Sequence, residues 1–155
     1  MKHYRRLTTE ELQPLEKDFV DFLVVNGITA DDWVSLKEKD IEKADRMVDL
    51  FSEVVFEGIF RKAQFLEVRT KRFVHAYQCL VDKIVLVGAE TTEAHADLSE
   101  GIGPNVPISI FMTEKAYNGK REYELFEMTQ KGCTLSDGQL FKSLSLAYME
   151  SKHGK

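Results

Sequence analysis

Apolar side chains recur at spacings of three and four residues over positions 8–62, which is the period of helices that bury one face. Capping patterns at Thr8 and Thr29, each with an acidic residue three positions later, predict where two helices begin. Pro14 lies inside the first helix, so we expect either a separate first turn or a kinked axis. A third helix begins at Asp40. Because its last turns are apolar nearly all round, we expect it at the domain centre.

Beyond Lys62 the apolar pattern changes to a period of two, and the segments are rich in β-branched and aromatic residues, as strands are. Short gaps between three of these segments favour antiparallel hairpins. Residues 84–89 are continuously apolar, so their strand is expected in the sheet interior. Pro107 favours the start of a fourth strand or an edge strand. The predicted strands cover residues 63–68, 73–79, 83–90 and 106–112.

The C-terminal part of the chain predicts two helices. Residues 114–131 are compatible with a hairpin or a helix, and the lack of alternation favours a helix over 120–131. Gly132 then ends this helix as its C′ residue, and Cys133 takes the C″ position. Ser136, with a glutamine three residues later, is predicted to cap the last helix.

These patterns together predict an α+β fold with N-terminal helices, a central antiparallel sheet of three to four strands, and C-terminal helices packed on that sheet. We expect a single domain over residues 1–155. It contains a long loop at 91–105 and a frayed tail at 151–155. Loops of this length are uncommon and tend to be functional or disordered.

Composition narrows the class of protein. With 43% hydrophobic and 30% charged residues, and no apolar run near the roughly 20 residues of a membrane helix, we expect a soluble protein that does not act at a membrane. The N-terminal segment lacks the apolar core of a secretion signal, and two cysteines are too few for a disulfide scaffold, so a cytoplasmic protein is predicted. The net charge of −5 disfavours nucleic acid, because a phosphate-binding face needs clustered Lys and Arg.

One candidate site combines carboxylates of the third helix with a histidine of a strand. Four acidic residues recur every four positions, which is typical of a solvated helix face. General acid and base chemistry is the alternative, with Glu53 and Glu57 as the best candidates. His75 has aromatic neighbours and is expected in an aromatic cluster. The enzymatic hypothesis is a ligand-binding or hydrolase-like site of Glu53, Glu57 and His75, with the long loop as its lid. The four acidic residues are Asp45, Asp49, Glu53 and Glu57.

Cys133 and the long loop offer two further candidates. A thiol near a helix N-terminus can act as a nucleophile, but a small apolar side chain at a helix junction is the favoured interpretation of Cys133. His95 and Asp97, with Glu93 and Glu100, are potential metal ligands in the loop. Their spacing matches no ligand motif, so a solvated acidic loop is favoured, and neither a metal nor a cofactor is predicted.

The segments "YRRLTTEEL", "FLVVNGITADDW", "DLFSEVVFE" and "GCTLSDGQLFKSL" resemble those of an uncharacterised family of small bacterial proteins, a domain of unknown function. The resemblance covers most of the chain. It implies a single cytosolic domain without a known activity, and it assigns a role to no residue.

A non-enzymatic protein is the favoured interpretation of the whole sequence. The usual catalytic and nucleotide-binding motifs are absent from it. Apolar residues such as Leu50 on the third helix, and the amphipathic last helix, stay available for a partner to cover. We therefore predict a domain that binds a protein partner or forms a homodimer.

Overall fold

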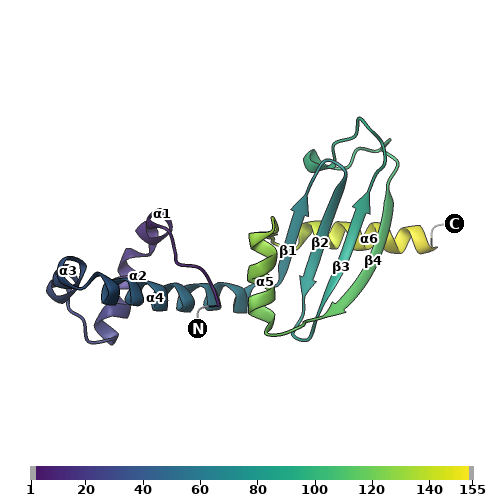
Figure 1. The fold of residues 1–155 in the computed structure, drawn as a ribbon. Coiled ribbons are helices and arrows are strands. Elements are labelled where there is room, and N and C mark those ends of the chain that lie inside the picture. Colours follow the sequence, from purple (N-terminus) through teal and green to yellow (C-terminus); the bar gives the residue numbers. More distant parts are fainter. Residues whose placement is uncertain (1–2, 154–155) are drawn as a thin grey trace. The chain divides into compact units, whose positions relative to one another are not determined.

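The computed structural model describes residues 3–153, and Figure 1 shows their helices and strands. The chain packs into two compact units, with the boundary between Arg61 and Lys62. The first unit is helical, and the second contains a sheet. Within the described residues, no helix is both long and apolar enough to cross a membrane. The single domain expected from the sequence stays a prediction.

The helices of the first unit begin where the capping patterns predict. The Thr8 and Thr29 hydroxyls each accept a hydrogen bond of 3.1 Å from the backbone N–H three residues later, which confirms both capping boxes. Pro14 lies in a separate 3-10 turn, the first of the two predicted alternatives. The elements are α1 (Thr9–Leu12), η1 (Gln13–Leu15), α2 (Glu16–Val25), α3 (Ala30–Lys39) and α4 (Ile41–Lys62).

Aromatic rings join α4 to the helices that precede it. The Phe19 ring of α2 lies 5.0 Å from the Phe51 ring of α4 and 5.1 Å from the Trp33 ring of α3, measured between centroids. Such tilted and edge-on arrangements are favourable beyond the apolar area that they bury. The wide apolar face of α4 thus supplies the surface on which α2 and α3 pack. The buried residues of this cluster are Leu23, Ile28 and Met47.

An antiparallel sheet with the strand order β4-β3-β2-β1-β5 is the basis of the second unit. It confirms the α+β class, the three predicted hairpin strands and the interior place of β3. The sheet has five strands rather than three to four, because the two-residue β5 pairs with β1 and is too short to show a period. β4 begins later than predicted, after Pro107, which has no N–H to donate. The strands are β1 (Phe65–Arg69), β2 (Phe73–Cys79), β3 (Lys83–Glu90), β4 (Ser109–Ala116) and β5 (Thr134–Leu135).

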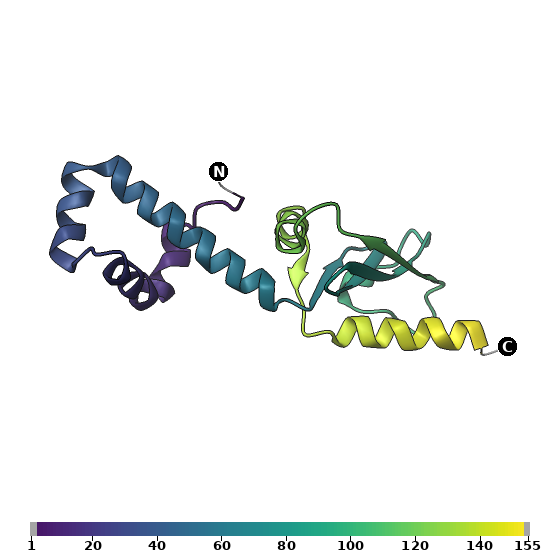
Figure 2. The ribbon, with the colours of Figure 1, turned by 90° about the horizontal axis from the view of Figure 1, so that it is seen from below.

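Helix α6 (Gln139–His153) covers one face of this sheet, as Figure 2 shows. The register places Val74 opposite Ala89 and Ala76 opposite Val87, so these four side chains share one face. They form a buried cluster with Leu144 of α6. The residues predicted to share a face of the fourth strand all pack against this cluster: Val106, Ile108, Ile110 and Met112.

The 91–105 loop is held in place by two sets of contacts. Leu98, in the 3-10 turn η2 (Leu98–Glu100), is 1% exposed and belongs to the cluster beneath α6. The Arg72 guanidinium donates hydrogen bonds of 2.6 Å to the carbonyl oxygens of Ala94 and Ala96. The loop is therefore packed on the sheet unit at both its apolar turn and its backbone.

The ambiguous segment after β4 contains the helix α5 (Arg121–Gln130), which confirms the favoured interpretation. Gly132 and Cys133 end this helix as predicted. The Cys133 N–H donates to the Met128 carbonyl at 3.1 Å, and the Gly132 N–H donates to the Thr129 carbonyl at 3.4 Å. This pair of bonds is the Schellman pattern, with Gly132 at C′ and Cys133 at C″.

Candidate functional site

Glu53 and Glu57 hold the N-terminal arm of the chain, residues 3–7, against α4. The Glu53 carboxylate accepts hydrogen bonds from the backbone N–H groups of His3 and Tyr4, at 3.0 and 2.9 Å. Glu57 Oε1 accepts a hydrogen bond of 2.7 Å from the Tyr4 hydroxyl. The structure therefore brings Glu53 and Glu57 together, because both carboxylates accept hydrogen bonds from Tyr4 of the same unit.

The rest of the acidic strip on α4 binds the same arm. Arg6 Nε lies 2.6 Å from Asp49 Oδ1, and Arg6 Nη1 lies 3.7 Å from Asp45 Oδ1. The side chains of Asp49 and Glu57 are only 14% and 19% exposed, so a solvated face is the wrong interpretation for these two. Like charges four residues apart repel one another, and the cation and N–H donors of the arm offset that repulsion. A catalytic role of Glu53 and Glu57 stays a prediction.

His75 lies on the face of the sheet that α6 does not cover. Its ring centroid is 4.5 Å from that of Phe73 and 5.7 Å from that of Phe111, so the expected aromatic cluster is present. Nε2 is buried and has no hydrogen-bond partner among the described residues, since Glu90 Oε1 is 3.9 Å away. Burial lowers the pKa of His75, and the Glu90 charge only partly opposes this. His75 belongs to the sheet unit, whereas Glu53 and Glu57 lie on α4 of the helical unit.

The two cysteines are free thiols in environments that disfavour the thiolate. Cys133 is half-buried after α5, and burial raises its pKa. Cys79 is buried in β2, and burial raises its pKa to about 11. Because the thiolate is the reactive form, these surroundings are typical of packing cysteines rather than of activated nucleophiles.

His95 and Asp97 are not gathered into a ligand set. The Asp97 carboxylate accepts hydrogen bonds from the backbone N–H of Ser99, at 3.0 Å, and from the Ser99 hydroxyl, and so caps η2. Within residues 3–153, no group of three histidine, cysteine, aspartate or glutamate side chains is placed to hold a metal ion.

The 91–105 loop borders a hollow, but not one that His75 reaches. Leu98 and Ile102 of the loop line a space of about 330 Å³ together with Leu140 of α6. This space lies on the face of the sheet that α6 covers. His75 alternates with Val74 and Ala76 along β2 and therefore points to the opposite face.

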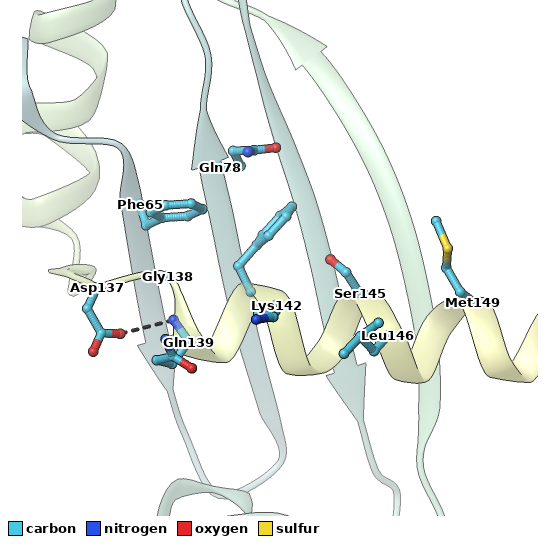
Figure 3. Close-up of a pocket in the computed structure, with 10 residues that line it drawn as sticks. Phe65, Gln78, Asp137, Gly138, Gln139, Lys142, Ser145, Leu146 and Met149 are labelled. Carbon is cyan, nitrogen blue, oxygen red and sulfur yellow. Dashed lines mark hydrogen bonds between the residues drawn. The ribbon is translucent and has the colours of Figure 1, made fainter.

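A groove of about 450 Å³ lies between α6 and the sheet, where β1 begins and β2 ends; we call it the α6 groove. Phe65 and Gln78 are paired across β1 and β2 and line its sheet side. Figure 3 shows both side chains projecting from the strands above α6. The residues of α6 that line the other side include Phe141, Lys142, Ser145, Leu146 and Met149.

The turn before α6 forms one end of the α6 groove and corrects a capping prediction. Ser136 is not the cap residue, because α6 begins only at Gln139; its N–H donates to the Phe65 carbonyl, and its Oγ accepts a hydrogen bond of 3.1 Å from the N–H of Gly138 within the turn. Asp137 Oδ1 instead accepts a hydrogen bond of 3.0 Å from the N–H of Gln139, the first residue of α6. A Cβ atom at Gly138 would lie 2.7 Å from the Phe65 ring, so only glycine lets that ring border the groove.

Ser145 and Gln78 are two of the polar residues in the lining, which also includes Asp137, Gln139 and Lys142. The Oγ atom of Ser145 is buried and has no hydrogen-bond partner among the described residues. A serine inside a helix often bonds the carbonyl four residues back, and this one does not. In Figure 3 its oxygen points away from the α6 axis, toward the strands that carry Phe65 and Gln78. The Gln78 amide, with one acceptor and two donors, lies on that opposite side.

This arrangement offers surface that can hold an apolar group, and Ser145 has no base beside it among the described residues. A serine nucleophile needs a base within hydrogen-bond reach, and no described residue bonds Ser145 Oγ. The Asp137 carboxylate is bonded to the turn, and His75 is on the far face of the sheet. What remains is apolar surface beside unused donors and acceptors, which fits an apolar group that carries an amide or a similar polar group.

No direct signal in the sequence indicates the groove, because its two sides lie far apart along the chain. Phe65 and Gln78 follow ordinary strand patterns, and Ser145 is one of several serines in the last helix. A weak signal does exist: Leu146 and Met149 are apolar, yet they lie off the stripe that packs Leu144 on the sheet. They are 56% and 58% exposed.

Fold and groove together define an α+β chain whose sheet unit has a mostly apolar groove beside α6. Residues 1–149 match a family of unknown function, DUF6495, and the chain belongs to that family. This confirms the resemblance to an uncharacterised family, while the bacterial and cytosolic origin stays a prediction. No curated protein and no solved structure matches the chain.

Proposed function

We propose that the chain is a non-enzymatic binding domain that accepts an apolar side chain of a protein partner, with its adjoining peptide group, in the α6 groove. The observation that carries the proposal is the buried hydroxyl of Ser145, which has no partner among the described residues of an otherwise mostly apolar groove. Leaving such a group unsatisfied costs about 1–3 kcal/mol. The Oγ atom has almost no exposed surface, so a partner that supplies the missing hydrogen bond recovers that free energy once the Ser145 side chain turns its hydroxyl into the groove.

The exposure of the groove favours a protein segment over a small molecule. Small-molecule sites typically enclose about 70–90% of their ligand. Here Leu146 and Met149 are both more than half exposed, so one side of any occupant stays open to solvent. A side chain on a continuing peptide requires such an opening.

The polar groups of the groove match the chemistry of a peptide unit. A peptide group presents one N–H donor and one carbonyl acceptor. Gln78 and Ser145 each offer both a donor and an acceptor, on opposite sides of the groove. An apolar side chain flanked by peptide groups therefore satisfies the lining more completely than a hydrocarbon does.

The test is a titration of the full chain with N-acetyl-leucine-methylamide, an apolar side chain between two peptide groups, followed by NMR. At about 0.3 kcal/mol for each of its about 13 non-hydrogen atoms, a ligand of this size binds with about 4 kcal/mol, a Kd near 1 mM. We expect saturable shifts that centre on Phe65, Gln78 and Ser145.

The matched variants are Leu146→Glu and Val81→Glu. Each places a carboxylate at an exposed apolar position of the sheet unit, but Leu146 lines the groove and Val81 lies in the turn between β2 and β3. Leu146→Glu is expected to raise the Kd of the probe about fivefold, because about 1 kcal/mol of apolar contact is lost. Val81→Glu should leave the Kd unchanged. Equal Kd values for both variants, or no saturable shift in the wild type, would contradict the proposal.

A further inference from the structure

The hollow of about 330 Å³ between α6, the sheet and the 91–105 loop is a second candidate site; we call it the loop hollow. Its walls are mostly apolar, and three of the residues that form them, Val74, Leu98 and Leu144, are buried. The Arg72 guanidinium holds the loop backbone in place on the sheet unit. The loop hollow is therefore a preformed apolar space of the size of a small-ligand site.

The loop hollow is elongated along α6. This helix crosses β1, β2, β3 and β4, as Figure 1 shows. The lining accordingly reaches from Arg69 on β1 to Ile110 on β4. Neighbouring strands lie about 4.8 Å apart, so the distance from β1 to β4 is about 14 Å. The volume is enough for about ten non-hydrogen atoms, if each takes roughly the 30 Å³ of a water molecule in the liquid. Length and volume together fit an unbranched chain.

Arg69 is the only charged side chain among the described residues that line the loop hollow. It is paired with Val74 across β1 and β2, so both side chains lie on the face that α6 covers. Its Nε donates a hydrogen bond of 2.6 Å to Glu67 Oε2, and within residues 3–153 its guanidinium makes no other hydrogen bond. The N–H groups of both terminal nitrogens are therefore available to a ligand.

A carboxylate matches this end of the loop hollow. A planar guanidinium binds a carboxylate through two parallel N–H···O bonds. Because the Arg69 side chain is 41% exposed, a carboxylate bound to it stays partly hydrated and avoids the cost of full burial. The neighbouring Glu67 repels anions, so a group with one negative charge is favoured over a phosphate with two. The apolar walls beyond Arg69 then take a hydrocarbon chain.

We propose that the loop hollow binds an aliphatic monocarboxylate of about eight carbons, with its carboxylate on Arg69 and its chain along α6 toward Ile110. The ligand is a small molecule and not a protein segment, so the inference goes beyond the proposed function. It uses no residue of the α6 groove. Either site can therefore fail its test without affecting the other.

The experiment is a titration of the full chain with sodium octanoate at pH 7, followed by NMR. Octanoate has about ten non-hydrogen atoms, for which a Kd of about 1–10 mM is typical. We expect saturable shifts of the Ile102, Ile110 and Leu140 methyl groups and of the Arg69 Nε–H group.

Arg69→Gln and Lys115→Gln are the matched variants, because each removes one positive charge from the sheet unit. Lys115 is exposed on β4, and alternation places it on the opposite face from Ile110. Arg69→Gln should raise the Kd of octanoate about tenfold, because charge-assisted hydrogen bonds are lost. Lys115→Gln should leave the Kd within about twofold of the wild-type value.

Glu67→Gln should change the Kd in the opposite direction. It removes the negative charge beside Arg69 and weakens the competing bond to Nε. We expect the Kd of octanoate to fall about threefold. An apolar space without a carboxylate site would show no such opposite effects of Arg69→Gln and Glu67→Gln.

Three results would overturn the inference: no saturable shift at the highest octanoate concentration, equal Kd values for Arg69→Gln and Lys115→Gln, or shifts centred on Phe65 and Met149. The last result would place octanoate in the α6 groove. The shifts are measured on the wild-type chain, so they do not depend on how well any variant folds.

Discussion

Replacement of Ser145 by alanine should stabilise the chain and weaken its binding at the same time. The buried Oγ atom has no hydrogen-bond partner among the described residues, so its removal abolishes a desolvation penalty of about 1 kcal/mol or more. Alanine also favours a helix over serine by about 0.5 kcal/mol. We therefore expect Ser145→Ala to raise the free energy of unfolding by about 1.5 kcal/mol.

Ser143→Ala is the matched control, because Ser143 is an exposed residue of the same helix. Ser143→Ala should raise the free energy of unfolding by about 0.5 kcal/mol, which is the difference in helix propensity between alanine and serine. The difference between the two variants, about 1 kcal/mol, isolates the cost of the buried hydroxyl. Urea unfolding, monitored by circular dichroism, measures the free energy of unfolding of each variant by linear extrapolation to water. The two values are compared when both variants have the same m-value.

Ser145→Ala should also raise the Kd of N-acetyl-leucine-methylamide about fivefold, because one hydrogen bond of about 1 kcal/mol is lost. A gain in stability joined to a loss of binding is typical of a residue kept for function. If Ser145→Ala is no more stable than Ser143→Ala, the hydroxyl is already satisfied, and the argument for the groove fails.

Three further predictions concern the stability of the fold. Gly88→Ala should lower the free energy of unfolding by about 1–3 kcal/mol, because the added Cβ would lie 2.6 Å from the Phe111 ring. Gly58→Ala should instead stabilise α4 by about 0.5–1 kcal/mol, because its Cβ would have nothing within 4 Å. Urea unfolding measures both free energies, and equal effects of the two substitutions would contradict the close contact at Gly88. Leu98→Ala should lower the free energy of unfolding by about 2–5 kcal/mol in the same assay, because this side chain is 1% exposed. A decrease of less than about 1 kcal/mol would mean that the 91–105 loop is not packed on the sheet unit. The Arg5 hydrogen bond, followed by the Thr8 backbone bond, lowers the pKa of Glu11 from 4.5 to about 2, so its contribution to stability is complete above about pH 4.5 and is lost as the pH falls toward 2. Glu11→Gln should therefore lessen the loss of stability between pH 6 and pH 3, and an unchanged pH dependence would refute the ion pair.

Local patterns predicted most of the secondary structure, because the forces that decide it act between near neighbours. The capping boxes of Thr8 and Thr29 and the C-terminal pattern at Gly132 and Cys133 depend on hydrogen bonds within a few residues. Alternation predicted the three hairpin strands for the same reason. β5 was missed because two residues have no period, and its existence depends on a long-range pairing with β1.

Residues that act together across long separations could not be found in this way. The acidic residues of α4 were recognised, but not that Glu53 and Glu57 bind Tyr4, which lies about fifty residues earlier in the chain. The basic arm at the N-terminus and the strip of acids were both visible in the sequence, and only the fold joins them. The α6 groove likewise needs Phe65 and Ser145 to be brought face to face by the packing of α6 on the sheet.

The most direct test of the proposed function is to locate N-acetyl-leucine-methylamide on the wild-type chain by intermolecular nuclear Overhauser effects. The groove predicts effects from the leucine methyl groups of the probe to the Phe65 and Phe141 ring protons and to the Met149 methyl group. Effects confined to Leu140 and Ile102, in the smaller hollow on the other side of α6, or effects to neither place at saturation, would contradict the account.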